Sequence, residues 1–191
     1  MRANTLRTMG TKNMAVLVRL PAGENINEWL ATNIIDFFNE LNLIYGAVHQ
    51  NCTNESCPVM CAGNFQYLWA DETNYKTPTK LSAPSYVDTL FDWAELQFND
   101  EAIFPIHETQ KFPKDFVKRV GVIMRRFFRV YAHIYHHHID YVCEIQAESH
   151  LNSCFKHLIF FAIEFSLMET KEMQPLEEII EKLREKDSTP N

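Results

Sequence analysis

The sequence has few of the features that mark membrane-embedded or non-globular chains. Its longest apolar run, Leu158 to Ile163, is six residues, whereas a helix needs about 20 to cross a bilayer. Five glycines and eight prolines in 191 residues are too few for a collagen-like or low-complexity chain. No repeat of fixed period is present. We therefore predict no transmembrane segment and no repeat architecture.

Two further absences concern location and partners. The N-terminal stretch MRANTLRTMGTKN has no apolar segment ahead of a cleavage site, so we expect no secretory signal and a cytoplasmic protein. Positive charge does not dominate, because 25 Asp and Glu outnumber 18 Lys and Arg and give a net charge of −7. General nucleic-acid binding relies on a dominant positive field, so we do not expect it here.

The hydrophobic content of 46% is enough to bury one sizeable core. Hydrophobic periodicity predicts an all-α helical bundle. Between residues 46 and 80 the helical period disappears, which predicts a long loop with a short β-hairpin near Phe65 to Trp69. A loop of this length inside a compact domain needs something to fix it. The predicted helices cover about residues 25–45, 82–100, 114–137 and 149–167, and a short one from Pro175 to near Leu183.

The chain divides into three parts by composition. Residues 1–19 are mostly polar and basic, so we expect a flexible or loosely docked N-terminal arm. Residues 20–186 are predicted to form a single domain, and residues 187–191 a C-terminal tail. At the start of the second predicted helix, Ser82 is a possible N-cap and Pro84 lies in the first turn.

The first predicted helix has an acidic face opposite its apolar stripe. Glu24, Glu28 and Asp36 fall in this acidic arc. Trp29 and Ile35 fall within or beside the same arc, away from the core stripe, so they are candidates for an exposed contact. The alternative is that the carboxylates only meet water.

Cysteine and histidine pairs offer a metal site. Structural zinc sites use four soft or borderline ligands, often two Cys and two His with short spacing inside each pair. Cys52 and Cys57 form one such pair in the loop, and His133 and His138 form another near a helix end. A bound ion would staple the loop to the bundle. Buried cysteines and a solvated histidine run are the alternative.

Helix geometry alone does not choose the histidine pair. On a regular helix His133 and His137 lie about 40° apart, and His133 and His138 about 140° apart. The second pair requires the helix to end or loosen near His136.

A local basic fan lies on the same predicted helix. Arg125, Arg126 and Arg129 project within an arc of about 100°. Guanidinium groups suit phosphate oxygens because they can donate two hydrogen bonds at once. In an acidic protein this pattern indicates one phosphorylated ligand, and an ordinary solvated face is the alternative.

With these residues placed, the chain from about Leu20 to Lys186 resembles the Mob (Mps-one-binder) family, and most closely its kinase-activating class, the coactivators of NDR/LATS kinases in Hippo and mitotic-exit signalling. Five segments match the family pattern at matching spacings. They are LPAGENINEWLATNIIDFFNELNLIYG, CTNESCPVM, WADETNYKTPTKLSAPSYVD, FRVYAHIYHHH and HLNSCFKHLIFFAIEF.

The resemblance implies a helical bundle with a structural Zn²⁺ and three sets of site residues. The implied zinc ligands are Cys52, Cys57, His133 and His138. The implied phosphothreonine-peptide pocket is Arg125, Arg126 and Arg129, where the family usually has one Lys and Arg125 keeps the charge. The surface implied to hold the basic N-terminal regulatory segment of the kinase is Glu24, Glu28, Trp29 and Asp36.

The implied function is a non-catalytic adaptor and coactivator for an NDR/LATS-type protein kinase and a phosphorylated upstream kinase or scaffold. Its implied locations are the cytoplasm, the nucleus and the spindle pole or centrosome. One alternative is a phocein-like adaptor of kinase and phosphatase complexes. Another is a zinc hydrolase with Asp140 or Glu144 as base, but no nucleophile motif, Gly-rich phosphate loop or HExxH pattern supports it.

Overall fold

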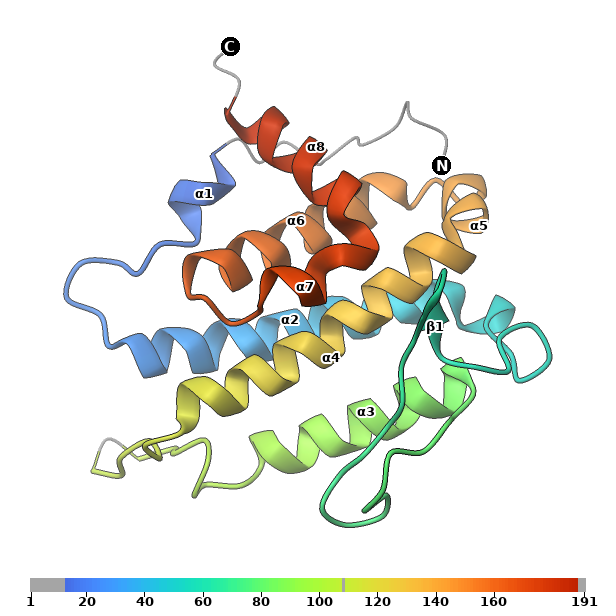
Figure 1. Ribbon diagram of the computed structural model, residues 1–191. Helices are drawn as coiled ribbons and strands as arrows, with labels where there is room; N and C mark the ends of the chain where they lie inside the picture. Colours follow the sequence, from blue (N-terminus) through green and yellow to red (C-terminus); the bar gives the residue numbers. More distant parts are fainter. Residues whose placement is uncertain (1–12, 108, 189–191) are drawn as a thin grey trace.

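The computed structural model describes residues 13–107 and 109–188 and has the predicted helical-bundle fold. Helices α2 (Ile26–Val48) and α4 (Phe116–His137) pack against each other along the middle of the molecule (Figure 1). Helix α6 (Glu148–Glu164) covers one side of this pair, and α3 (Ala83–Phe98) packs against α4 on the other. The bundle therefore has three layers, with α2 and α4 in the centre.

The long helices begin where capping chemistry places their starts. The side chain of Asn25 accepts hydrogen bonds from the backbone N–H groups of Asn27, at 2.8 Å, and Glu28, at 3.4 Å. The Ser82 hydroxyl accepts from the N–H of Ser85 at 3.3 Å, and Pro84 lies in the first turn of α3. Each cap satisfies donors that have no partner inside the helix. The predicted N-cap at Ser82 is confirmed.

Aromatic side chains fill the space between the layers. Phe37 of α2 meets Phe161 of α6 edge to face, with ring centroids 5.2 Å apart. Phe128 of α4 lies 6.0 Å from Phe155 of α6. All four rings are buried, and such pairs add about 0.5–1.5 kcal/mol beyond their buried area. Phe37 lies on the apolar side of α2, opposite the acidic face, and is fully buried.

The loop that follows α2 carries a short hairpin that rests on α4. After the 3₁₀ turn η1 (His49–Asn51), strands β1 (Cys61–Ala62) and β2 (Phe65–Gln66) pair antiparallel. Gly63 lies in the connecting turn with φ +56°, and a Cβ there would lie 3.2 Å from the ring of His136. Glycine suits both the positive φ and the close approach. The predicted hairpin is present, but it starts a few residues before Phe65.

Several short elements escaped prediction because they span too few residues to show a period. They are α1 (Met14–Leu17), α5 (Ile139–Glu144), α7 (Thr170–Met173) and the 3₁₀ turn η2 (Gln174–Leu176). The last helix, α8 (Glu177–Ser188), extends beyond the predicted end near Leu183. It runs into the expected C-terminal tail.

The part of the predicted N-terminal arm that the structure describes is docked, and its residues 1–12 lie outside the described part. Met14 and Val18 are buried, and α1 packs against α6. The Trp29 indole N–H donates to the Val18 carbonyl at 3.3 Å. Two buried apolar side chains therefore anchor residues 13–19 to the bundle.

A buried ion pair fastens α1 and α8 to α6. Lys156 Nζ lies 2.6 Å from Asp187 Oδ1, and the two side chains are only 4% and 5% exposed. The Asp187 carboxylate also accepts from the N–H groups of Met14, at 2.9 Å, and Ala15, at 3.1 Å. Burial alone would raise the pKa of Asp187, but Lys156 and the two amides outweigh it and lower the pKa. Its stabilisation is present above the unfolded value of about 3.9 and is lost as pH falls through the folded pKa.

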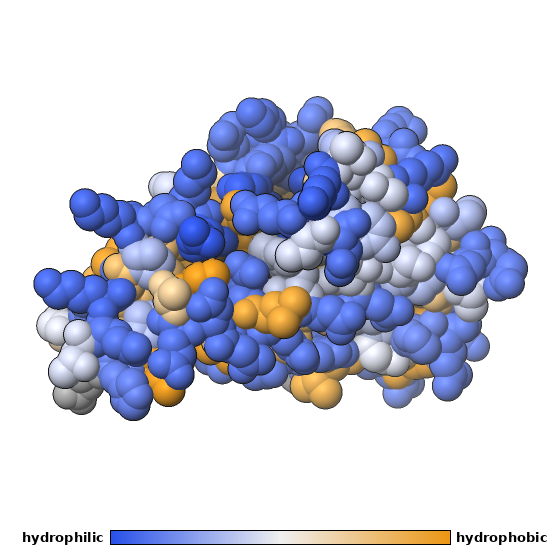
Figure 2. All heavy atoms as spheres, turned by 90° about the horizontal axis from the view of Figure 1, so that it is seen from below, coloured by the Kyte–Doolittle hydropathy of each residue, from blue (hydrophilic) through white to orange (hydrophobic). Residues whose placement is uncertain are grey.

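The face of the molecule on the side of α3 is mainly polar (Figure 2). On the α3 side, seen from below, hydrophilic residues cover most of the face and apolar ones form small, separate spots (Figure 2). Within the described ranges, none of the helices combines the length and apolar character needed to span a membrane.

We predict that Asp187→Ala lowers the free energy of unfolding by about 3 kcal/mol. The substitution leaves the Lys156 ammonium buried without its carboxylate, and removing one partner of a buried pair costs on the order of 3–5 kcal/mol. Urea denaturation at pH 7 followed by circular dichroism measures the change.

The matched control is Glu181→Ala, which removes an exposed carboxylate from the same helix. It should change the unfolding free energy by less than about 0.5 kcal/mol. Equal effects of the two substitutions would contradict a structural role for the Asp187 pair.

Candidate metal centre and charged surfaces

The end of α4 brings two imidazoles together. His133 lies in the last turns of the helix, which ends at His137, and His138 has φ −126° and ψ 3° outside the helical region. This change of direction turns the His138 ring back towards His133, and their Nε2 atoms lie 3.3 Å apart. The pairing of His133 with His138 requires a helix that ends near His136, and α4 meets this condition.

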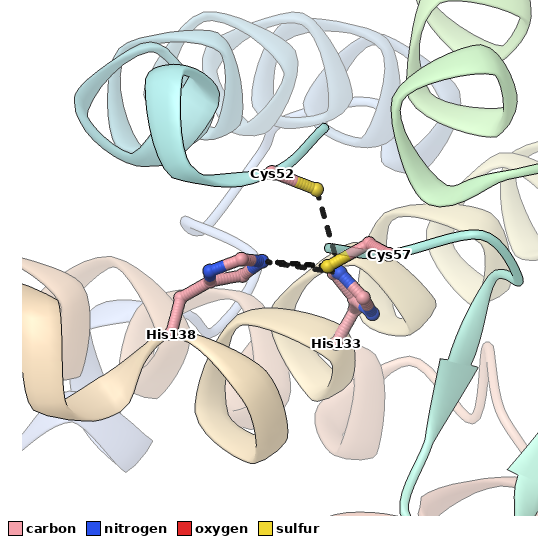
Figure 3. Close-up of side chains that lie close together, drawn as sticks. All are labelled: Cys52, Cys57, His133 and His138. Atoms are coloured by element: carbon pink, nitrogen blue, oxygen red, sulfur yellow. Dashed lines mark hydrogen bonds between the residues drawn. The ribbon is translucent and has the colours of Figure 1, made fainter. Parts of the chain in front are cut away.

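Two cysteines approach the same point from the loop. Cys52 follows η1, and a tight turn leads to Cys57, whose N–H donates to the Thr53 carbonyl at 2.8 Å. Cys52 Sγ lies 3.5 Å from His133 Nε2, and Cys57 Sγ lies 3.5 Å from His138 Nε2. All four donor atoms lie within 4.8 Å of one another and all four residues are buried (Figure 3).

These separations fit a tetrahedral zinc ion. Bonds of about 2.3 Å to sulfur and about 2.0–2.1 Å to nitrogen give sulfur–nitrogen edges of about 3.6 Å and a nitrogen–nitrogen edge of about 3.3 Å. The observed distances of 3.5, 3.5 and 3.3 Å agree with them. Four protein donors complete the tetrahedron, which is the arrangement of a structural site and leaves no open position for a substrate.

Protonation also suits a cation. The Cys61 carbonyl can only accept, so His133 Nδ1 donates to it at 2.7 Å and leaves Nε2 free as a ligand. Burial lowers the pKa of His133 to about 4, which keeps the ring neutral at pH 7. Burial raises the pKa of Cys52 to about 12, and a bound cation reverses this effect because it stabilises the thiolate.

The remaining cysteines and histidines of this region lie outside the four-residue cluster. His136 Nε2 donates to the Pro175 carbonyl at 2.8 Å. His137 Nε2 lies 3.4 Å from Cys61 Sγ. Cys143 is exposed, and Cys154 is buried near His150.

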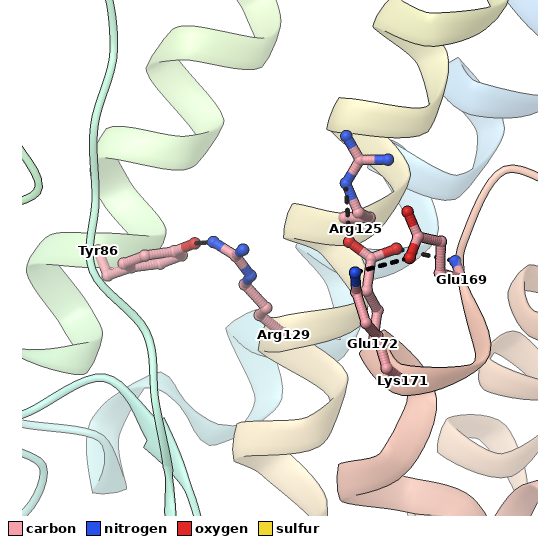
Figure 4. Close-up of polar contacts among 6 residues, drawn as sticks. All are labelled: Tyr86, Arg125, Arg129, Glu169, Lys171 and Glu172. Carbon is pink, nitrogen blue, oxygen red and sulfur yellow. Dashed lines mark hydrogen bonds and ion pairs between the residues drawn. The ribbon is translucent and has the colours of Figure 1, made fainter.

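The basic fan is divided between two environments, and the first is a pocket. Arg125 and Arg129 line a cavity of about 160 Å³ between α4, the loop and α7. Arg125 Nε is paired with Glu172 Oε1 at 3.2 Å, and Arg129 Nη1 donates to the Tyr86 hydroxyl at 3.0 Å (Figure 4). The other lining residues are Phe65, Tyr67, Phe128, Met168, Lys171, Glu172 and Pro175.

Arg126 occupies the second environment. Its guanidinium carbon lies 4.1 Å from the ring centre of Trp69 and 4.0 Å from that of Trp93. Nη2 donates to the Ala70 carbonyl at 2.7 Å. Burial lowers its pKa, but a guanidinium stays charged at neutral pH. In the described part of the chain, Arg126 does not line the pocket with Arg125 and Arg129.

The acidic face of α2 is accessible. Glu28 and Asp36 lie on this helix, whereas Glu24 precedes its N-cap, Asn25. All three carboxylates are exposed, and none of them forms an ion pair within residues 13–107 and 109–188. Trp29 is half-buried and packs against the core, and its indole N–H is bonded to Val18. The expected exposure of Trp29 is therefore only partial, because its ring also anchors the residues that precede α2.

Sequence reasoning missed two charged residues at the pocket, Lys171 and Glu172. Both lie on α7, which spans four residues. A segment of this length gives no periodicity that would place its charges beside Arg125. They become visible only once α7 is folded against α4.

Comparisons with known proteins identify the family of the chain. Residues 6–176 match the model of the Mob1/phocein family. The MOB kinase activator-like 1A of Arabidopsis thaliana is 49% identical over 92% of this chain and 82% of its own length. The MOB kinase activator 3A of Bos taurus is 46% identical over 87% and 77%, and the MOB kinase activator-like 3 of Drosophila melanogaster is 46% identical over 92% and 80%. The chain therefore belongs to the Mob1/phocein family.

Proposed function

We propose that this protein is a non-catalytic adaptor that activates a protein kinase of the NDR/LATS type and also binds a phosphorylated upstream kinase or scaffold. The observation that carries the proposal is the family relationship, because relatives that are 46–49% identical over most of the chain are named MOB kinase activators. A four-donor cluster without an open position also favours a structural ion over a catalytic one.

The proposed cofactor is one structural Zn²⁺ held by Cys52, Cys57, His133 and His138. The donor separations support it, and so does the need of an irregular loop for an anchor. The ion would link the loop after α2 to the end of α4. In this way it would hold the hairpin and Tyr67 beside the pocket.

The proposed phosphopeptide site is the pocket of Arg125 and Arg129. Two guanidinium groups and Lys171 provide positive charge, and the aromatic rings of Phe65 and Tyr67 form apolar walls for a peptide. Arg126 takes a supporting part in this proposal, because its contacts with Trp69 and Trp93 join the loop and α3 to α4. A phosphate would replace the Glu172 carboxylate as the partner of Arg125.

The proposed kinase-binding surface is the acidic face of α2 with the residue before its N-cap, and it consists of Glu24, Glu28, Trp29 and Asp36. Exposed carboxylates without ion pairs are suited to a segment that is rich in Arg and Lys, and their field would speed its approach. The partly exposed ring of Trp29 would add apolar contact. A phocein-like adaptor would keep the fold but not bind this kinase segment.

We predict that the purified protein contains one tightly held zinc ion and that Cys57→Ser loses it. The variant should unfold at a lower temperature, because the binding energy of a structural ion contributes directly to folding. Elemental analysis and thermal denaturation measure the two effects. The control is Cys143→Ser, which alters an exposed cysteine outside the cluster. Full zinc content in the Cys57 variant would contradict the assigned ligands.

We predict opposite effects of two substitutions on binding of a phosphothreonine peptide. Arg129→Ala should weaken binding about tenfold or more, because a hydrogen bond to a charged group contributes about 1.5–3 kcal/mol. Glu172→Gln should strengthen it by up to about fivefold, because a partly exposed ion pair contributes about 0–1 kcal/mol. Isothermal titration calorimetry with the phosphorylated and unphosphorylated peptides measures both.

Glu178→Gln is the matched control for Glu172→Gln. It removes the same charge from an exposed position of α8 that does not line the pocket. An equal gain in affinity from both variants would show an effect of net charge and would contradict competition at Arg125.

We predict that Glu28→Lys with Asp36→Lys weakens binding of an NDR-type kinase N-terminal segment at least about tenfold, or about 1.4 kcal/mol, because like charges then face each other. Surface plasmon resonance measures it, and phosphopeptide binding should stay unchanged. Asp92→Lys with Glu95→Lys, on exposed positions of α3, makes the same change in net charge as a control. Equal loss in both pairs would argue against a dedicated site on α2, and no binding by the unmodified protein would favour the phocein-like alternative.

A further inference from the structure

A third thiol–imidazole pair lies beside the four-residue cluster. Cys61 Sγ and His137 Nε2 are 3.4 Å apart, and this contact is accessible to solvent. Cys61 is half-buried and His137 is exposed. Neither is among the four clustered ligands, and the proposed function does not use them.

The separation of this pair matches the metal-ligand edges next to it. The two sulfur–nitrogen edges inside the cluster are both 3.5 Å, and the tetrahedral value for zinc is about 3.6 Å. A linear arrangement would need about 4.3 Å or more between sulfur and nitrogen, from the same bond lengths. The pair is therefore spaced as two neighbouring ligands of a tetrahedral ion.

Both side chains are held in place by the neighbouring structure. Cys61 belongs to β1, where it pairs with Gln66, and its carbonyl accepts from His133 Nδ1 at 2.7 Å. The ring of His137 stacks on the ring of His133, with centroids 4.7 Å apart and an interplanar angle of 28°. Holding two ligands in one geometry beforehand reduces the entropy lost when an ion binds.

Charge does not oppose a second cation at this place. A divalent ion bound by the thiolates of Cys52 and Cys57 forms a unit that is formally neutral. A second ion beside it would meet little net repulsion. Sulfur and imidazole nitrogen are ligands that zinc shares with other thiophilic metals.

We propose that Cys61 and His137 form a second metal position, which binds a thiophilic divalent cation such as Zn²⁺ in contact with solvent. Two coordination positions come from the protein and water fills the others, while the thiol proton leaves to solvent as the ion binds. An ion at this position binds more weakly than one enclosed by four protein ligands, and it exchanges with ions in solution. This assignment does not depend on binding of a kinase or a phosphopeptide.

The test is a titration of the full-length protein with Zn²⁺ alone, after dialysis that leaves only tightly held metal. Native mass spectrometry and isothermal titration calorimetry count the added ions. The unmodified protein should take up one additional equivalent. Cys61→Ser and His137→Gln should each lose this equivalent and keep the zinc content found after dialysis, which also shows that they are folded.

Cys143→Ser is the control, because Cys143 is an exposed thiol beside the carboxylate of Glu148 and outside the Cys61–His137 pair. It should keep the additional equivalent. Absence of that equivalent from the unmodified protein would overturn the proposal, and so would its persistence in either the Cys61 or the His137 variant. A protein without metal after dialysis would contradict the four-ligand zinc proposal, yet the difference between the unmodified protein and Cys61→Ser would still test this one.

Discussion

The end of α4 at His137 is the constraint on which the rest of the site depends. Because His138 leaves the helical conformation, two imidazole nitrogens lie 3.3 Å apart and face the cysteines of the loop. A continued helix would point the two rings in different directions. The loop has little regular structure beyond a hairpin of two short strands. Its position therefore depends on contacts with α4, which include this cluster and the packing of β1 against the helix.

The position of the loop in turn shapes the basic pocket. Tyr67 lines the pocket and lies 5.2 Å below the guanidinium of Arg129. Trp69, two residues later, contacts the guanidinium of Arg126, which Trp93 also contacts with its ring nearly perpendicular to that of Trp69. Contacts with two aromatic rings restrict the movement of the guanidinium. The cluster and the pocket are consequently linked through a few residues of one loop segment.

Charge is arranged differently at the two surfaces. On α2 the carboxylates have no internal partner among the described residues, so their field extends into solvent. In the pocket, Arg125 already has the carboxylate of Glu172. An anion entering the pocket must compete with this internal partner, whereas a cation approaching α2 meets no such partner among residues 13–107 and 109–188. Affinity at the pocket thus depends on the difference between phosphate and carboxylate and not on charge alone.

Much of the fold could be predicted from the sequence, because long helices show their period and their caps. Ser82 and Asn25 mark helix starts, and the apolar stripe of α2 is buried as expected. The Cys52 and Cys57 pair was visible from spacing, but the choice of His138 over His137 depends on a helix end that the resemblance supplied and periodicity did not.

The division of the basic fan could not be predicted. Arg126 and Arg129 are neighbours on the wheel, and only tertiary contacts separate them. Trp69 reaches Arg126 from the loop and Trp93 reaches it from α3. Glu172 and the docking of Met14 likewise depend on short elements, which have too few residues to carry a signal.

The Asp187 carboxylate has a mechanical consequence. It joins the amides of Met14 and Ala15 to Lys156, so the first and last turns of the described chain are tied to the same helix. A pulling force applied at residues 13 and 188 would strain these contacts of Asp187 before the force reached the aromatic side chains of the core. The two ends of the described chain are thus held together by one carboxylate. Tension between them would act first on the contacts of Asp187.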